Sequence, residues 1–247
     1  MRMTLRQPDA DAASSTRPIA GSAHFMGFLL IGAGVAVLGV MAQQAPANLA
    51  DSAQLAPHGQ AVHVYLAAIC MDWALLYYCW MGVRRHGGTL ETLSGGMWRS
   101  VRDVVKDVAI AIPFWVAWEA AAYGLTWLLG PSSARTVDSL LPRSTVEVLV
   151  WMATCITAGV CEEIGFRGYV LRQLQAFTGS TALAVIGQGL VFGLFHVYQG
   201  WKNAVVISLL GMVYGLLAIW RRNLRVNILS HAMTDFWEGW LKFLVWP

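Results

Sequence analysis

Charged side chains are scarce in this sequence: Asp, Glu, Lys and Arg make up only 13% of its 247 residues. Soluble domains carry about 25% charged residues. Hydrophobic residues reach 57%, and the mean hydropathy is +0.53. A soluble core of this size cannot bury so much apolar surface, so the composition predicts an integral membrane protein that contacts lipid.

The sequence also lacks paired cysteines. Its four cysteines, Cys70, Cys79, Cys155 and Cys161, all fall in apolar segments, and no two have the Cys-x-x-Cys spacing. Disulfide frameworks and structural zinc sites are recognised by such spacings. We therefore expect buried free thiols rather than a cross-linked scaffold.

Seven apolar segments approach the ~20 residues that an α-helix needs to cross a bilayer. An eighth span would require one of them to be broken or re-entrant. The expected fold class is all-α, a polytopic transmembrane helical bundle of about seven to eight membrane helices. Two glycine pairs, Gly189 with Gly193 and Gly211 with Gly215, have a spacing that lets membrane helices approach closely. The seven segments are 25–42, 62–83, 108–129, 145–165, 182–197, 204–220 and 226–246.

Outside these spans the chain offers little material for another domain. Residues 1–24 form a polar, Ala/Ser-rich leader that we expect to be disordered. Residues 25–247 contain no soluble domain, repeat or long linker, so we expect a single membrane domain. A helix of mixed character over 89–106 is expected to lie on the inner membrane surface.

Basic residues are unevenly distributed along the chain. With the N-terminus inside, most of the 17 Lys and Arg residues fall in inner segments, and 43–61 has none. The positive-inside rule then predicts a cytoplasmic N-terminus in a multi-pass protein of the bacterial cytoplasmic membrane. The net charge of +3 reflects this topology, so we expect no nucleic-acid partner.

Ionisable groups nevertheless occur in the apolar second half of the chain. Each costs about 2.5–3.5 kcal/mol at the centre of a membrane helix, so chemistry or transport must retain them. The first group is Glu162, Glu163 and Arg167. Glu163 and Arg167 are four residues apart and should pair on a helix. Glu162 points about 100° away, which leaves it free to act as a general base.

Two further groups each contain a histidine. Phe192 precedes His196 by one helical turn and can brace its ring. A neutral imidazole beside Glu162 would hold a water molecule between them. His231 and Asp235 share one helix face, where they either pair or point together at a substrate carbonyl. One such contact alone is typical of a packed histidine, but three groups on three helices predict an active site.

Simple antiparallel helices with these boundaries do not bring the three groups together. His196 would lie roughly 15 Å in depth from Glu162 and His231, at 1.5 Å per residue. Strong tilt, a displaced start of the fifth helix or a re-entrant segment is expected to reconcile them.

In this order, Glu-Glu-x-x-x-Arg, Phe-x-x-x-His and His-x-x-x-Asp resemble the signature motifs of the CAAX protease and bacteriocin-processing (CPBP, also called Abi) family. This family of intramembrane proteases includes the Ras-converting CAAX endoproteases. The resemblance covers about residues 145–247. It implies an endopeptidase that hydrolyses a peptide bond of a membrane-anchored or amphipathic protein or peptide, by CAAX-type or secreted-peptide processing.

The resemblance also implies roles for single residues. Glu162 would activate the water that His196 helps to hold. His231 and Asp235 would stabilise the oxyanion, although Asn is common in the family at the second position. An ionised Asp235 would repel an oxyanion, so it is expected either to be protonated or to orient His231. The supporting residues are Glu163, Arg167 and Phe192.

The sequence leaves alternatives open for both the cofactor and the function. The family contains proteins described as metalloproteases and others read as metal-free glutamate proteases, so Zn²⁺ is a candidate cofactor with Glu162, His196 and His231 as candidate ligands. The sequence has no His-Glu-x-x-His, no Gly-x-Ser that opens a membrane helix and no membrane aspartate after glycine. A transporter or proton-relay protein would use the same groups with Asp72 and Glu119. A non-catalytic scaffold would keep the fold for partner binding.

Overall fold

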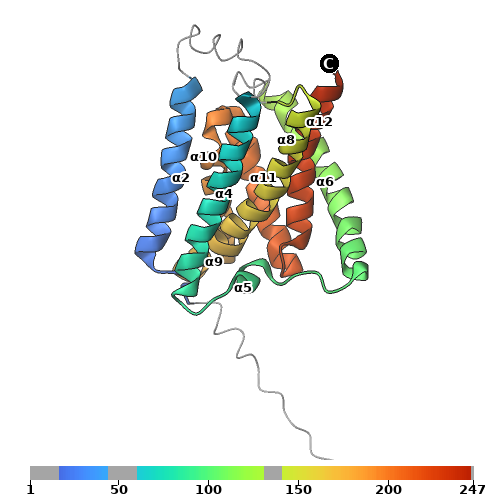
Figure 1. The fold of residues 1–247 in the computed structure, drawn as a ribbon. Coiled ribbons are helices and arrows are strands. Elements are labelled where there is room, and N and C mark those ends of the chain that lie inside the picture. Colours follow the sequence, from blue (N-terminus) through green and yellow to red (C-terminus); the bar gives the residue numbers. More distant parts are fainter. Residues whose placement is uncertain (1–16, 44–59, 131–140, 246–247) are drawn as a thin grey trace, which may run out of the picture.

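The computed structural model describes residues 17–43, 60–130 and 141–245, and every regular element within these ranges is helical. Figure 1 shows the helices as a bundle, which confirms the predicted all-α class. The longer helices are α2 (Ser22–Gln43), α4 (Gln60–Arg84), α6 (Val101–Leu129), α8 (Thr145–Glu163), α10 (Thr181–Phe195), α11 (Trp201–Arg221) and α12 (Arg225–Val245). The shorter elements are α5 (Leu90–Ser94), the π-helix η1 (Ile164–Val170), α9 (Leu171–Thr178) and the 3₁₀ turn η2 (Val197–Gln199).

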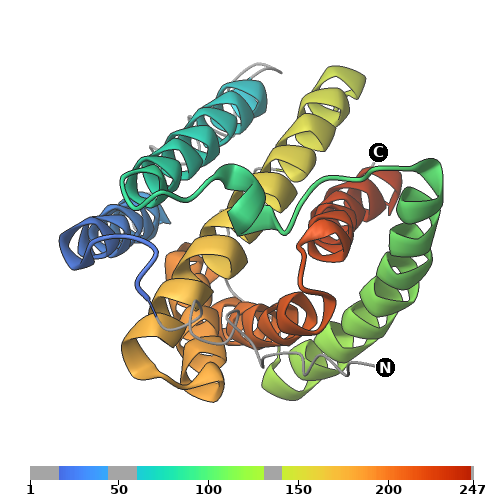
Figure 2. The ribbon, with the colours of Figure 1, turned by 90° about the horizontal axis from the view of Figure 1, so that it is seen from below.

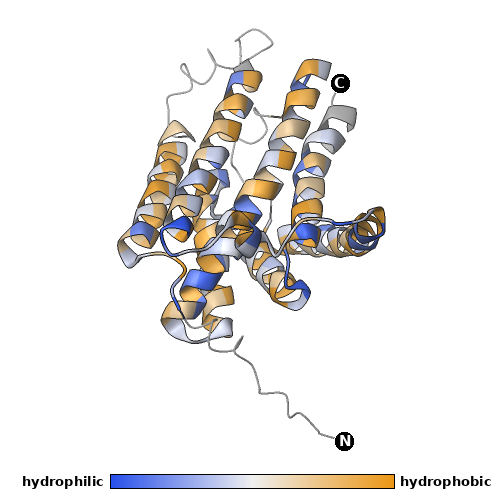
Figure 3. Ribbon diagram, turned by 60° about the horizontal axis from the view of Figure 1, so that its bottom comes forward, coloured by the Kyte–Doolittle hydropathy of each residue, from blue (hydrophilic) through white to orange (hydrophobic). Residues whose placement is uncertain are grey.

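All seven predicted segments are helices, and successive ones run in opposite directions (Figure 1). Among the described residues, five helical units are long and apolar enough to cross a membrane: α2, α4, α6, the continuous unit Thr145–Thr178, and α11. Helix α10 is apolar but has only 15 residues. Hydrophobic residues cover much of the helices, and hydrophilic residues gather around the end that carries α5 (Figure 3).

The fourth span is longer than predicted, and this difference positions the site. Helical structure does not end at residue 165 but continues from α8 through η1 and α9, giving a unit of 34 residues. In a π-helix the backbone hydrogen bonds reach five residues, so the chain keeps its helical course. Glu162 and Glu163 therefore lie near the middle of the unit rather than near its inner end.

The predicted surface helix over 89–106 is wrong as a single element. Thr89 and Thr92 form a capping box that starts the short α5. Gly95 and Gly96 end it with φ of 75° and 93°, a left-handed conformation that glycine adopts without strain. Helix α6 then begins after its own N-cap, Ser100, whose side chain accepts from the backbone of the first turn.

Part of the predicted leader is ordered. Residues 1–16 lie outside the described residues, but α2 already begins at Ser22. The backbone N–H groups of Ile19 and Ala20 donate to Gln173 Oε1 at 3.0 and 3.1 Å, and Gln173 Nε2 donates to Ala20 O at 2.8 Å. The prediction of disorder is therefore wrong for residues 17–24, because a buried glutamine fixes their backbone.

Helices α10 and α11 approach closely at the glycines noted in the sequence. A Cβ atom on Gly211 would lie 2.9 Å from Gly189 Cα, and one on Gly193 would lie 2.4 Å from Ala204 O. Neither position has room for a side chain, so the small-residue spacing marks a true helix interface. Seen from below, α12 lies between α8 and α6, and α4 runs beside α8 (Figure 2).

Candidate active site

The Glu163–Arg167 pair predicted from helical spacing forms at the junction of α8 and η1. Arg167 Nη1 donates to Glu163 Oε1 at 2.8 Å, and both side chains are fully buried. The guanidinium carbon lies 4.3 Å from the centre of the Phe192 ring and 5.1 Å from that of Tyr214. Aromatic faces and a carboxylate thus compensate the buried cation.

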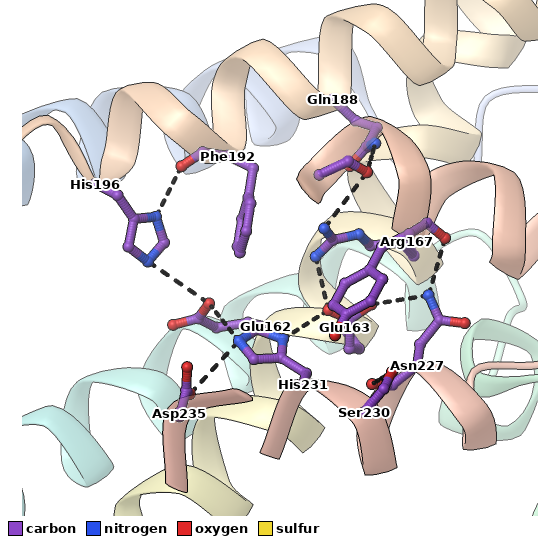
Figure 4. A network of polar contacts seen from close by, with 12 residues as sticks. Glu162, Glu163, Arg167, Gln188, Phe192, His196, Asn227, Ser230, His231 and Asp235 are labelled. Carbon is purple, nitrogen blue, oxygen red and sulfur yellow. Dashed lines mark hydrogen bonds and ion pairs between the residues drawn. The ribbon is translucent and has the colours of Figure 1, made fainter. Parts of the chain in front are cut away.

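Glu163 also holds the last helix. Its Oε1 atom lies 2.7 Å from His231 Nδ1, and its Oε2 atom accepts from Asn227 Nδ2 at 3.2 Å (Figure 4). With Glu163 ionised, the Nδ1–H group of His231 donates to it. One of the two roles expected for Asp235 was to orient His231. The closest carboxylate to His231 is instead Glu163, which leaves His231 Nε2 facing Glu162 and Asp235.

His196 lies where α10 ends. Its Nδ1 atom is 2.8 Å from Phe192 O, and its ring centre is 4.7 Å from the Phe192 ring. The expected bracing by Phe192 is therefore confirmed and involves both its ring and its carbonyl. Because Nδ1–H donates to that carbonyl, Nε2 of a neutral ring keeps its lone pair, and it faces Glu162 Oε2 at 3.9 Å.

The three predicted groups meet at Glu162 (Figure 4). Its Oε2 atom lies 3.7 Å from His231 Nε2 and 3.9 Å from His196 Nε2, and His231 Nε2 lies 3.6 Å from Asp235 Oδ2. Glu162 Oε2 is buried without a hydrogen-bond partner in the described protein. These separations are longer than direct hydrogen bonds, and a water molecule can bridge polar groups placed in this way. The expected offset of roughly 15 Å in depth is wrong, because α8 continues past the site.

The exposed fraction of the side chains increases across the site from Glu163 to Asp235. The exposed fraction of the side chain is 0% for Glu163, 5% for His231, 16% for His196, 20% for Glu162 and 33% for Asp235. Glu163 therefore forms the closed end of the site, and Asp235 lies at its open side. A substrate group would approach past Asp235 and meet Glu162 and the two Nε2 atoms.

The residue types at the site are those that zinc binds, and each histidine Nδ1 atom has an acceptor, as second-shell partners provide in zinc sites. Two ligands of one tetrahedral zinc ion lie about 3.4 Å apart. The Glu162–histidine separations of 3.7 and 3.9 Å are longer. Across the described ranges, no group of three or more His, Cys, Asp or Glu side chains is arranged as a metal site. Metal dependence stays a prediction.

Sequence reasoning missed the buried amides that support the site. Gln188 Nε2 donates to Gly211 O at 2.5 Å, and the same carbonyl accepts from Arg167 Nη2 at 3.5 Å. Asn227 binds Glu163, and both amides are completely buried. Each stands in an apolar stretch of sequence. Their position in apolar sequence could have identified them, because amides inside membrane bundles make hydrogen bonds between helices.

The fold and the site together define a polytopic helical membrane protein with a glutamate–histidine centre inside the bundle. Residues 144–237 match a family model described as Rce1-like, type II CAAX prenyl endopeptidase Rce1-like. This part of the chain is thus similar to CAAX proteases of the CPBP family, which confirms the resemblance seen in its motifs. The matched residues include all three motifs but not α2, α4 or α6. No curated protein and no solved structure matches the chain.

Proposed function

We propose that this membrane protease hydrolyses a peptide bond close to the membrane anchor of its substrate, with Glu162 as the general base. The observation that carries the proposal is the convergence of both histidine Nε2 atoms on Glu162 Oε2, which has no hydrogen bond among the described residues. The match to a peptidase family favours hydrolysis over the transporter and scaffold alternatives. Cleavage of lipid-anchored peptides by the purified protein in liposomes, followed by mass spectrometry, tests the proposal.

In this mechanism the attacking water lies between Glu162 and His196. His196 Nε2 accepts one hydrogen bond from it, and Glu162 takes its proton as the water oxygen attacks the carbonyl carbon. The carbonyl oxygen becomes an oxyanion, to which His231 donates through Nε2–H in its protonated form. Glu163 balances the charge of that imidazolium through Nδ1–H. Glu162 then delivers its proton to the leaving amine, so that the carboxylate is regenerated.

We expect chelation to leave the cleavage rate unchanged. The longer glutamate–histidine separations and the buried Arg167 nearby favour a water held by protein groups over a metal ion. The measurement compares initial rates before and after dialysis against a strong zinc chelator, and again after addition of Zn²⁺. Loss of activity that Zn²⁺ restores would instead assign Glu162, His196 and His231 as zinc ligands.

The proposed orientation places the N-terminus and the α5 end of the bundle in the cytoplasm. Support comes from arginines at that end: α4 ends at Arg84, α11 ends at Arg221 and α12 begins at Arg225. In a cysteine-free background, Thr178→Cys should react with an impermeant thiol reagent only from the cytoplasmic side. His63→Cys, at the start of α4, should react only from outside. Both side chains are exposed, so reversed labelling would invert the topology.

A further inference from the structure

Asp72 is a carboxylate in the membrane helix α4, outside the segment that matches the protease family. It lies on the face of α4 that packs into the bundle, in line with the buried residues Tyr65, Leu76 and Cys79. These positions are separated by three to seven residues, the spacing of one helix face. Asp72 therefore points toward the protein rather than toward lipid.

Contacts on both sides of Asp72 place it beside α8, within about two turns of Glu162. The ring centre of Tyr65, two turns before it, lies 5.2 Å from that of Trp151 in α8. Cys79, two turns after it, belongs to the same buried cluster as Cys161, the residue before the two site glutamates. Helices α4 and α8 run side by side in the same direction (Figure 1). Asp72 is thus held beside the stretch of α8 that leads into the site.

The carboxylate of Asp72 contributes to the same field as the site residues. It interacts electrostatically with Glu162, Asp235 and His231. Tyr198, in η2, interacts electrostatically with the carboxylates of Glu162, Asp235 and Asp72. Asp72 forms no hydrogen bond or ion pair with any other described residue. Its carboxylate thus lies within electrostatic range of the site and has no hydrogen bond to another described residue.

A carboxylate without a hydrogen-bond partner is costly in a membrane helix and is kept there for a function. Asp72 adds a fourth acidic side chain to Glu162, Glu163 and Asp235, close to the single guanidinium of Arg167. A cation in the bound substrate would favour the ionised form of Asp72 and offset this concentration of acidic groups.

Resting on the proposed protease function, we propose that Asp72 is a specificity-determining residue that binds a basic side chain of the substrate close to the scissile bond. The cation would approach from the α4 side, while the scissile carbonyl faces Glu162 and His231. The ion pair forms in a site shielded from bulk water, where such pairs discriminate strongly between substrates.

The test uses lipid-anchored peptides that carry either Lys or its neutral counterpart norleucine at one of three positions on each side of the cleaved bond. In liposomes, the wild-type protein should cleave one Lys peptide at least about tenfold more efficiently than its norleucine partner. Asp72→Asn should abolish that preference, mainly by raising KM for the Lys peptide to the value for its norleucine partner. Because Asp72 is unpaired, the thermal stability of Asp72→Asn should not fall.

Glu119→Gln is the matched control, because Glu119 is a carboxylate of the membrane helix α6 that faces Trp115 and Thr234. This variant should keep the Lys preference. A preference retained in Asp72→Asn, or an equal loss of kcat for both peptides, would overturn the proposal. Binding of the same peptides, measured by fluorescence anisotropy, decides the role of Asp72 independently of cleavage. Absence of cleavage with Lys-dependent binding intact would contradict the protease mechanism but not the role of Asp72.

Discussion

Glu162→Gln should reduce peptide hydrolysis by about 10²- to 10⁴-fold while the protein stays folded. The amide has the shape of the carboxylate but cannot accept the proton of the attacking water. Folding should be unaffected, because Glu162 Oε2 has no hydrogen bond within the described protein to lose. Single-turnover rates with a lipid-anchored peptide give the loss, and thermal unfolding followed by circular dichroism gives the stability.

A matched control is Glu91→Gln, which makes the same change on the exposed side of α5. Its rate should equal that of the wild-type protein. If Glu162→Gln keeps more than about a tenth of the wild-type activity, Glu162 is not the base, since general-base catalysis contributes at least 10²-fold.

Glu163→Ala should lower the free energy of unfolding by about 3–5 kcal/mol and reduce activity as well. The substitution strands the completely buried Arg167 without its carboxylate. It also removes the acceptor of His231 Nδ1 and of Asn227 Nδ2, which join the last helix to α8. Denaturant unfolding of the purified protein measures the change in stability.

A double variant separates the two tasks of Glu163. Glu163→Gln combined with Arg167→Met removes both charges, so much of the lost stability should return, because apolar replacement of a buried ion pair is often neutral. Activity should remain low, because His231 no longer has a carboxylate at Nδ1. Wild-type stability of Glu163→Ala would contradict the structural part of this assignment.

Local spacing explains what was predictable from the sequence. Glu163 with Arg167 and Phe192 with His196 are four residues apart, and a helix brings such neighbours together whatever its surroundings. The bond between His231 and Glu163 joins residues 68 positions apart. No periodicity encodes which atom of His231 meets which carboxylate, since that depends on the packing of α12 against α8.

The predictions that failed concern the positions at which helices begin and end. The predicted fourth segment ended at residue 165, but the helix continues through η1, which contains Gly165 and Gly168. The chain stays helical because its backbone hydrogen bonds change length, a property that hydropathy does not register. Gly95 and Gly96 do break a helix, since both need positive φ. Glycine alone thus predicts a boundary only where the backbone must leave the right-handed region.

The π-helix η1 also changes the direction in which side chains project along the helical unit Thr145–Thr178. Each residue that a π-helix inserts turns the helix beyond it by about 100° relative to a regular α-helix. The portion before the shift aims Glu162 and Glu163 at α10 and α12, whereas the portion after it aims Gln173 at the backbone before α2. One helical unit of 34 residues therefore contacts α10 and α12 with one face and the backbone before α2 with another. The rotation that η1 introduces therefore links the positions of Glu162 and Glu163 to the hydrogen bonds by which Gln173 holds the residues before α2.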